Sequence, residues 1–249
     1  MIVDRRSLMR SAGALLAAGT PTARAEGRRI EAIAFDVFTI FDPRSITAVT
    51  EARLPGRGEA LAALWRTRQF EYCWLRTLYG NYTDFWRVSE EALNFAGKSL
   101  KIELDDTTRA ALMQALMEIA PWPDSLAALR RMREAGLRLA YLSVMTPRML
   151  EAISDRAGVA DLFEFKLSTD AVRAFKPDPR AYAMAERAFA LPRAKIVFAA
   201  FGGWDAAGAK SFGLETFWVN RLGVPREGLG VAPDAEGPTL DDLAKYVLA

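Results

Sequence analysis

The chain has 249 residues, 51% of them hydrophobic and 26% charged, which is typical of a globular protein with a substantial core. Its net charge of +2 is too small and too dispersed to indicate a nucleic-acid partner. The absence of histidine and the presence of one cysteine exclude histidine catalysis, intramolecular disulfides and cysteine-based zinc sites, so any catalysis must rely on carboxylates, lysine, arginine and tyrosine.

Residues 1–25 have the features of an export signal. An arginine pair, Arg5-Arg6, precedes a mildly apolar run at 12–18, and Ala23-Arg24-Ala25 fits a small-x-small cleavage site. The segment resembles a twin-arginine signal peptide and predicts a periplasmic protein cleaved after Ala25. The apolar run is too short to span a bilayer, so no stable membrane anchor is expected. The alternative is a leader without a targeting role.

The folded part begins with an apolar strand, Ile30 to Phe35, which runs directly into Asp36. A carboxylate at the C-terminal end of a central parallel strand lies at the crevice where doubly wound sheets bind ligands. A lone acid after a buried strand needs a partner, and Lys176 and Asp205 follow later strands. The order indicates an aspartate nucleophile in an α/β fold.

Residues 43–120 are expected to form a helical cap inserted after the first strand. One helix starts near Gly58, a second carries Phe85, and a third runs over 107–119. Their aromatic stripes predict a cap core, with some rings facing the crevice above the strand ends. Cys73, between two aromatic residues and without a histidine base, is interpreted as core packing.

The rest of the chain alternates helices with strands. Helices are expected over 124–135, from 147, over 178–190 and over 204–212, with strands at 137–142, 163–167, 196–200 and 215–219. Parallel strands joined by helices require right-handed crossovers, which place helices on both faces of the sheet. Residues 26–42 and 121–249 are therefore predicted to form a Rossmann-like, doubly wound α/β core.

Several stretches resemble the haloacid dehalogenase superfamily, and most closely its L-2-haloacid dehalogenases. They span most of the chain after Arg29: Phe35-Asp36-Val37-Phe38-Thr39, Ala63-Leu64-Trp65-Arg66, Tyr72-Cys73-Trp74-Leu75-Arg76, Leu142-Ser143, Phe175-Lys176-Pro177-Asp178, Tyr182 and Trp204-Asp205-Ala206-Ala207-Gly208-Ala209. Phosphatases of this superfamily hold Mg²⁺ and use a second aspartate two residues after the nucleophile. Here that position is Phe38, which neither binds a hard cation nor donates a proton, so a metal-dependent phosphatase is disfavoured.

The resemblance implies hydrolysis of a small halogenated carboxylic acid without metal or cofactor. Asp36 would displace the halide and form an ester, which water then hydrolyses. Arg66 would meet the leaving halide, Lys176 would pair with Asp36, and Asp205 would orient Lys176 and help to place the water. The remaining residues that the resemblance assigns to substrate or to this network are Phe38, Thr39, Phe85, Ser143, Val144, Tyr182 and Trp204. A homodimer is also implied.

The chain departs from the family pattern within this site. The motif Tyr-Gly-Thr-Leu is one residue short and reads Phe38-Thr39-Ile40, and Val144 replaces an asparagine. Ala200 and Gly202 replace a serine and an asparagine, so donors that position halide and water are missing. Two alternatives stay open: an impaired or vestigial protein that binds small carboxylates, and a hydrolase of another small acid.

Overall fold

The core of the protein is a parallel sheet of six strands. The computed structural model describes residues 30–249, so the expected export signal lies outside the described residues. The strand order is β3-β2-β1-β4-β5-β6, and every pairing is parallel. The strands are β1 (Ala32–Phe35), β2 (Arg138–Ser143), β3 (Phe165–Ser168), β4 (Ile196–Ala200), β5 (Glu215–Val219) and β6 (Ala235–Gly237). This arrangement confirms the predicted doubly wound α/β fold.

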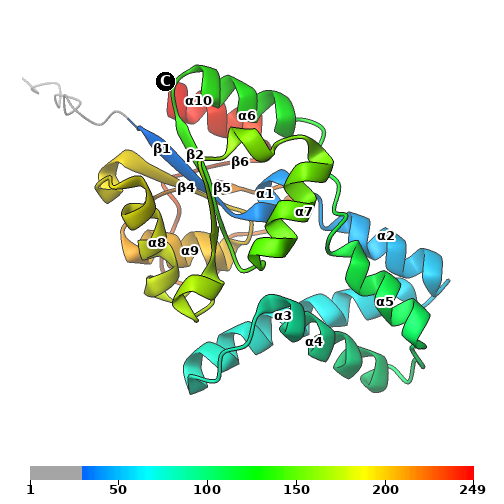
Figure 1. The fold of residues 1–249 in the computed structure, drawn as a ribbon. Coiled ribbons are helices and arrows are strands. Elements are labelled where there is room, and N and C mark those ends of the chain that lie inside the picture. The colour runs from blue at the N-terminus through cyan, green and yellow to red at the C-terminus, as the bar shows by residue number, and fades with distance from the viewer. Residues whose placement is uncertain (1–29) are drawn as a thin grey trace, which may run out of the picture.

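Helices cover both faces of this sheet (Figure 1). One face carries α6 (Ser125–Glu134), α7 (Pro147–Ala157) and α10 (Leu240–Leu248), and the other carries α8 (Pro179–Phe189) and α9 (Gly203–Phe212). Short 3-10 turns lie between these elements, at Ala160–Leu162, Thr169–Val172 and Arg193–Lys195. The two layers of helix leave the carboxyl ends of the strands as the edge available for a site.

The central strand β1 explains why its sequence is continuously apolar. Ile33 and Phe35 pack with the α6, α7 and α10 layer, whereas Ala32 and Ala34 pack with α8 and α9. Successive side chains of a strand point to opposite faces, so both sets are fully buried.

Four helices inserted between β1 and β2 form the cap, which lies below the sheet in Figure 1. After the single turn α1 (Val37–Ile40) they are α2 (Arg44–Arg53), α3 (Gly58–Tyr79), α4 (Phe85–Ser99) and α5 (Asp106–Ala115). A Cβ atom at Gly58 would lie 2.3 Å from Cα of Glu51, so only glycine lets α3 begin this close to α2. The chain passes from the core into the cap after Phe41 and returns at Pro121. These two residues form an isolated antiparallel β-bridge.

Several elements differ from the sequence prediction. The helix α2, the strand β6 and the helix α10 were not expected, and the helix expected to end at 119, α5, ends at Ala115. The α2 segment has few apolar residues and shows no clear helical periodicity, and β6 has only three residues. None of the described helices combines the length and hydropathy needed to cross a membrane.

Candidate active site

Asp36 lies immediately after β1, at the carboxyl end of the sheet. It caps the turn α1, and its Oδ1 accepts a hydrogen bond of 2.8 Å from the backbone N–H of Phe38. Its own N–H donates to the carbonyl of Ala199 on β4. The side chain is 11% exposed, so the carboxylate is largely enclosed but still accessible on one side.

Lys176 lies between two carboxylates. Its Nζ is 2.6 Å from Oδ2 of Asp36 and 2.6 Å from Oδ2 of Asp205. The other oxygen of Asp205 accepts a 2.7 Å hydrogen bond from the Tyr182 hydroxyl. Lys176 and Asp205 are each only 1% exposed, so this is a buried network in which each charge has close partners.

Burial and charge act against one another in this network. Burial alone would lower the pKa of Lys176, but the charges of Asp205 and Asp36 outweigh it and raise that pKa, so the ammonium stays charged. Burial raises the pKa of Asp205 to about 6, against the opposing pull of Lys176. Burial also raises the pKa of Tyr182 well above its usual value, which keeps its hydroxyl a donor. Burial therefore shifts the loss of the Asp205 proton toward higher pH than for a free aspartate.

The topology explains why these residues meet. Asp36 follows β1, Asp205 lies in the first turn of α9 just after β4, and Lys176 precedes α8. The strands β1 and β4 are neighbours and parallel, so their carboxyl ends open at the same edge of the sheet. Three segments distant in sequence thus deliver one ion-paired cluster.

A cavity of about 60 Å³ lies between the cap and the core. Its wall combines apolar side chains with the polar groups of two arginines, one glutamine and one threonine: Phe38, Pro43, Arg44, Ile46, Thr47, Ala62, Trp65, Arg66, Gln69, Phe70, Phe85 and Leu116. A single buried water needs only about 10–15 Å³, so this space suits a small group.

Arg66 carries a positive charge into this wall. It is partly accessible to solvent, and within residues 30–249 no carboxylate forms an ion pair with it. Burial lowers the pKa of Arg66, and the nearby charge of Asp36 opposes that shift. The guanidinium is therefore a charged donor that an incoming anion can use.

The other predicted site residues lie partly in the cavity wall and partly outside it. Phe38 and Phe85 line the cavity with Arg66. Trp204 does not contribute to that wall; its ring lies 5.3 Å from the rings of Phe70 and Trp74.

The remaining three predicted residues are buried, Thr39 within α1 and Ser143 and Val144 at the end of β2. The Thr39 hydroxyl donates to the carbonyl of Asp36 at 2.7 Å, and Oγ of Ser143 accepts from the N–H of Met145 at 3.1 Å. Val144 is buried beside them. The structure thus gives Thr39 and Ser143 contacts that support the backbone around the site, and their predicted contacts with substrate stay predictions.

Position 202 is constrained by its neighbour. A Cβ atom on Gly202 would lie 2.8 Å from Nε1 of Trp204, so a larger side chain requires the indole to move. The side chain of Ala200 is fully buried and apolar. The packing near β4 is therefore adapted to the small residues Ala200 and Gly202, by which this chain departs from the family pattern.

Sequence reasoning missed Gln69, Phe70 and Arg44 in the cavity wall. Gln69 and Phe70 follow Arg66 by three and four residues, which places all three on one face of α3, so helical spacing was an available signal. Arg44 belongs to α2, for which the sequence offered no comparable pattern. Within residues 30–249 no group of three or more acidic or cysteine side chains is arranged to hold a metal ion.

The chain is similar to known proteins over most of its length. The family model for haloacid dehalogenase-like hydrolases matches residues 4–213. A (S)-2-haloacid dehalogenase of Pseudomonas sp. (strain YL) is 41% identical over 212 residues, covering 85% of this chain and 91% of the relative.

Two solved structures show the same similarity in three dimensions. An L-2-haloacid dehalogenase crystal structure has a TM-score of 0.87 at 44% identity and covers 89% of this chain and 100% of its own. The L-2-haloacid dehalogenase of Xanthobacter autotrophicus with chloropropionic acid covalently bound has a TM-score of 0.82 at 36% identity, covering 88% and 99% of the two chains. The chain therefore belongs to the haloacid dehalogenase-like hydrolase family.

Proposed function

We propose that the protein hydrolyses short 2-haloalkanoic acids to 2-hydroxy acids through an ester on Asp36. The observation that carries this proposal is the buried Asp36–Lys176–Asp205 network beside a small cavity whose wall includes Arg66. The relatives named (S)-2-haloacid dehalogenase, and the related structure with covalently bound chloropropionic acid, support the same reaction.

In the first step a carboxylate oxygen of Asp36 attacks the carbon that bears the halogen. A carbon–oxygen bond forms, the carbon–halogen bond breaks with its electron pair, and the halide leaves toward the charge of Arg66. Lys176 holds the other side of the Asp36 carboxylate and fixes its direction of attack.

In the second step water attacks the carboxyl carbon of the Asp36 ester. The negative charge that develops on an ester oxygen can be met by the backbone N–H of Phe38 and by Lys176. The carbon–oxygen bond to the carboxyl carbon breaks, the 2-hydroxy acid departs, and the aspartate is restored with release of one proton. Asp205, held by Tyr182, is the nearby carboxylate that orients Lys176.

One observation favours a second candidate, a protein that binds small carboxylates but turns over slowly or not at all. Ala200 and Gly202 supply no polar side chain near the ester, and Trp204 occupies the space beside Gly202. Removal of one preorganised donor commonly costs on the order of a hundredfold in rate, so hydrolysis of the ester is the vulnerable step.

We also propose export to the periplasm through a twin-arginine route. The arginine pair and the short apolar run before Ala25 support it. Export of the full chain fused to a reporter, compared with an Arg5→Lys/Arg6→Lys variant, tests this point independently of the chemistry.

The test of the function is halide release from (S)- and (R)-2-chloropropionate and from chloroacetate, with Asp36→Asn as the inactive variant and Asp241→Asn as the matched surface control. We expect steady release from the wild type and the control and none from Asp36→Asn. A single burst with a covalent adduct on Asp36 in mass spectrometry would support the second candidate. If no halide is released and no adduct forms on Asp36, the dehalogenase assignment is wrong.

A further inference from the structure

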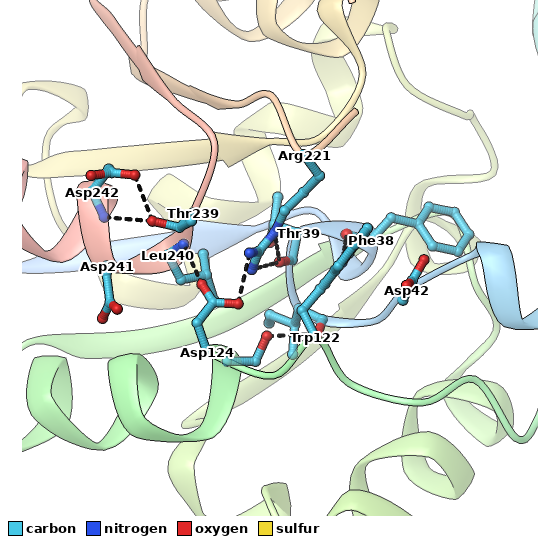
Figure 2. Close-up of polar contacts among 12 residues, drawn as sticks. Phe38, Thr39, Asp42, Trp122, Asp124, Arg221, Thr239, Leu240, Asp241 and Asp242 are labelled. Atoms are coloured by element: carbon cyan, nitrogen blue, oxygen red, sulfur yellow. Dashed lines mark hydrogen bonds and ion pairs between the residues drawn. The ribbon is translucent and has the colours of Figure 1, made fainter. Parts of the chain in front are cut away.

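Arg221, which lies outside the network around Asp36, makes buried contacts with the turn that carries this residue. It follows β5, and its side chain is 4% exposed. Its Nη2 and Nε atoms lie 2.7 and 3.2 Å from the carbonyl oxygen of Thr39. Its Nη1 lies 2.7 Å from Oδ1 of Asp124. Figure 2 shows the guanidinium reaching both partners at once.

The turn α1 needs such contacts because it is only four residues long. The N–H of Phe41 binds the carbonyl of Val37, while the next three carbonyls are met by groups from other parts of the chain. Phe38 O accepts from Nε1 of Trp122, Thr39 O accepts from Arg221, and Ile40 O accepts from the N–H of Trp122 and the hydroxyl of Ser125. Arg221 is the only cation in this set, and a positive charge at a helical C-terminus is favourable.

The opposite end of the same turn contacts Asp36. The N–H of Phe38 donates to Oδ1 of Asp36, and the carbonyl of Phe38 is bound to Trp122. The turn thus lies between Asp36, whose carboxylate is held by Lys176, and Arg221, so a tilt of residues 37–40 would move the Phe38 N–H relative to the carboxylate.

Asp124 holds the guanidinium in place. Its second oxygen, Oδ2, accepts from the N–H of Leu240 at the start of α10, so the acid joins α6, α10 and the β5 loop. Asp42 is paired with Arg44 at 2.6 Å and is not a partner of Arg221. The Arg221 guanidinium also lies 5.0 Å from the centre of the Trp122 ring.

We propose that Arg221 is a positioning residue for the reaction: it holds the turn α1 through the Thr39 carbonyl and thereby keeps the Phe38 N–H on Asp36. The rate predictions rest on the proposed dehalogenase function. Removal of the contact should lower kcat about ten- to a hundredfold, because small misplacements of reacting groups cost rates of this size, and should leave KM nearly unchanged.

The test compares Arg221→Met/Asp124→Asn with the wild type. The double change removes the contact to Thr39 without stranding a buried carboxylate, and the asparagine oxygen can still accept from Leu240. Arg226→Met/Glu236→Gln removes an exposed ion pair between the same loop and β6 and is the matched control. Arg221→Lys keeps the charge with a single donor group, and we expect it to recover part of kcat.

Two measurements on each variant decide the question: kcat and KM for 2-chloropropionate at a temperature well below the measured Tm, and hydrogen exchange of the backbone amides of residues 36–41. We expect lower kcat and faster exchange in the Arg221 double variant only. Unchanged exchange at 36–41 overturns the proposal, and so does full kcat with faster exchange. If the wild type releases no halide, the dehalogenase assignment fails, and exchange alone then decides the positioning role.

Discussion

The Nζ atom of Lys176 lies 2.6 Å from Oδ2 of Asp36, although 140 residues separate the two in the chain. Because Asp205 approaches the same Nζ, the buried cluster holds two negative charges and one positive charge. The protein tolerates this imbalance through two further donors, the N–H of Phe38 and the hydroxyl of Tyr182.

Lys176→Met should abolish halide release and destabilise the fold. The change leaves two buried carboxylates without their shared cation, which costs about 3–5 kcal/mol. Urea unfolding at pH 8 and pH 5 measures it, and the loss should be smaller at pH 5 because the stranded acids can then take up a proton. Lys245→Met, at an exposed ion pair, serves as the control and should change stability by less than about 1 kcal/mol.

The rate of hydrolysis should depend on the charge of Asp205. Burial raises the pKa of this acid from 3.8 to about 6, so its proton is bound as the pH falls through 6 and the negative charge that orients Lys176 is lost. We therefore expect kcat to fall below pH 6. The pKa of Lys176 is raised above 10.5, so no loss of its charge is expected up to pH 10.

The pH profile of kcat measures this, with Asp205→Asn as the comparison. The residual activity of that variant should lack the inflection near pH 6. If kcat falls below pH 6 in the same way in both proteins, a group other than Asp205 causes the fall.

Gly208→Ala should disturb the Asp36–Lys176–Asp205 network through Tyr182, which binds Asp205. A Cβ atom there would lie 2.5 Å from Oη of Tyr182 and 2.7 Å from Cβ of Pro177, so Tyr182 must shift away from Asp205. We expect a cost of about 1–3 kcal/mol in stability, together with lower kcat.

Thermal unfolding and steady-state kinetics check the Gly208 prediction. Gly228→Ala, where a Cβ meets nothing within 4 Å, is the matched control and should behave like the wild type. Tyr182→Phe in the Gly208→Ala background removes the clashing hydroxyl and should recover part of the stability. Wild-type stability in Gly208→Ala alone would contradict the packing argument.

Arg66→Met should lower kcat with little effect on stability. The guanidinium is partly exposed and in the proposed mechanism meets the developing charge of the halide, so we expect a loss on the order of a hundredfold, with partial recovery in Arg66→Lys. Stability should change by about 0.5 kcal/mol or less. Halide-release kinetics and urea unfolding separate the two effects, and Arg87→Met, on the exposed side of α4, is the control. A rise in KM alone would mean that Arg66 binds substrate without assisting departure of the halide.

Much of the core was predictable because strands buried on both faces produce continuous apolar runs. The run before Asp36 and the segment 196–200 before Asp205 were recognised in this way, and both lie at the carboxyl edge of the sheet. The helix α2 was not predicted, because its sequence is too polar to show which face is buried.

The sequence by itself determined the α/β fold and the order of its main elements, because hydrophobic period is a local property, and it predicted the chemistry of Asp36, Lys176 and Asp205 from their residue types and the family resemblance. Only the tertiary structure decided that Trp204 lies outside the cavity wall and that Arg221 reaches the carbonyl of Thr39. The physical reason is that such contacts depend on how helices and loops from distant parts of the chain pack together, which no local pattern records.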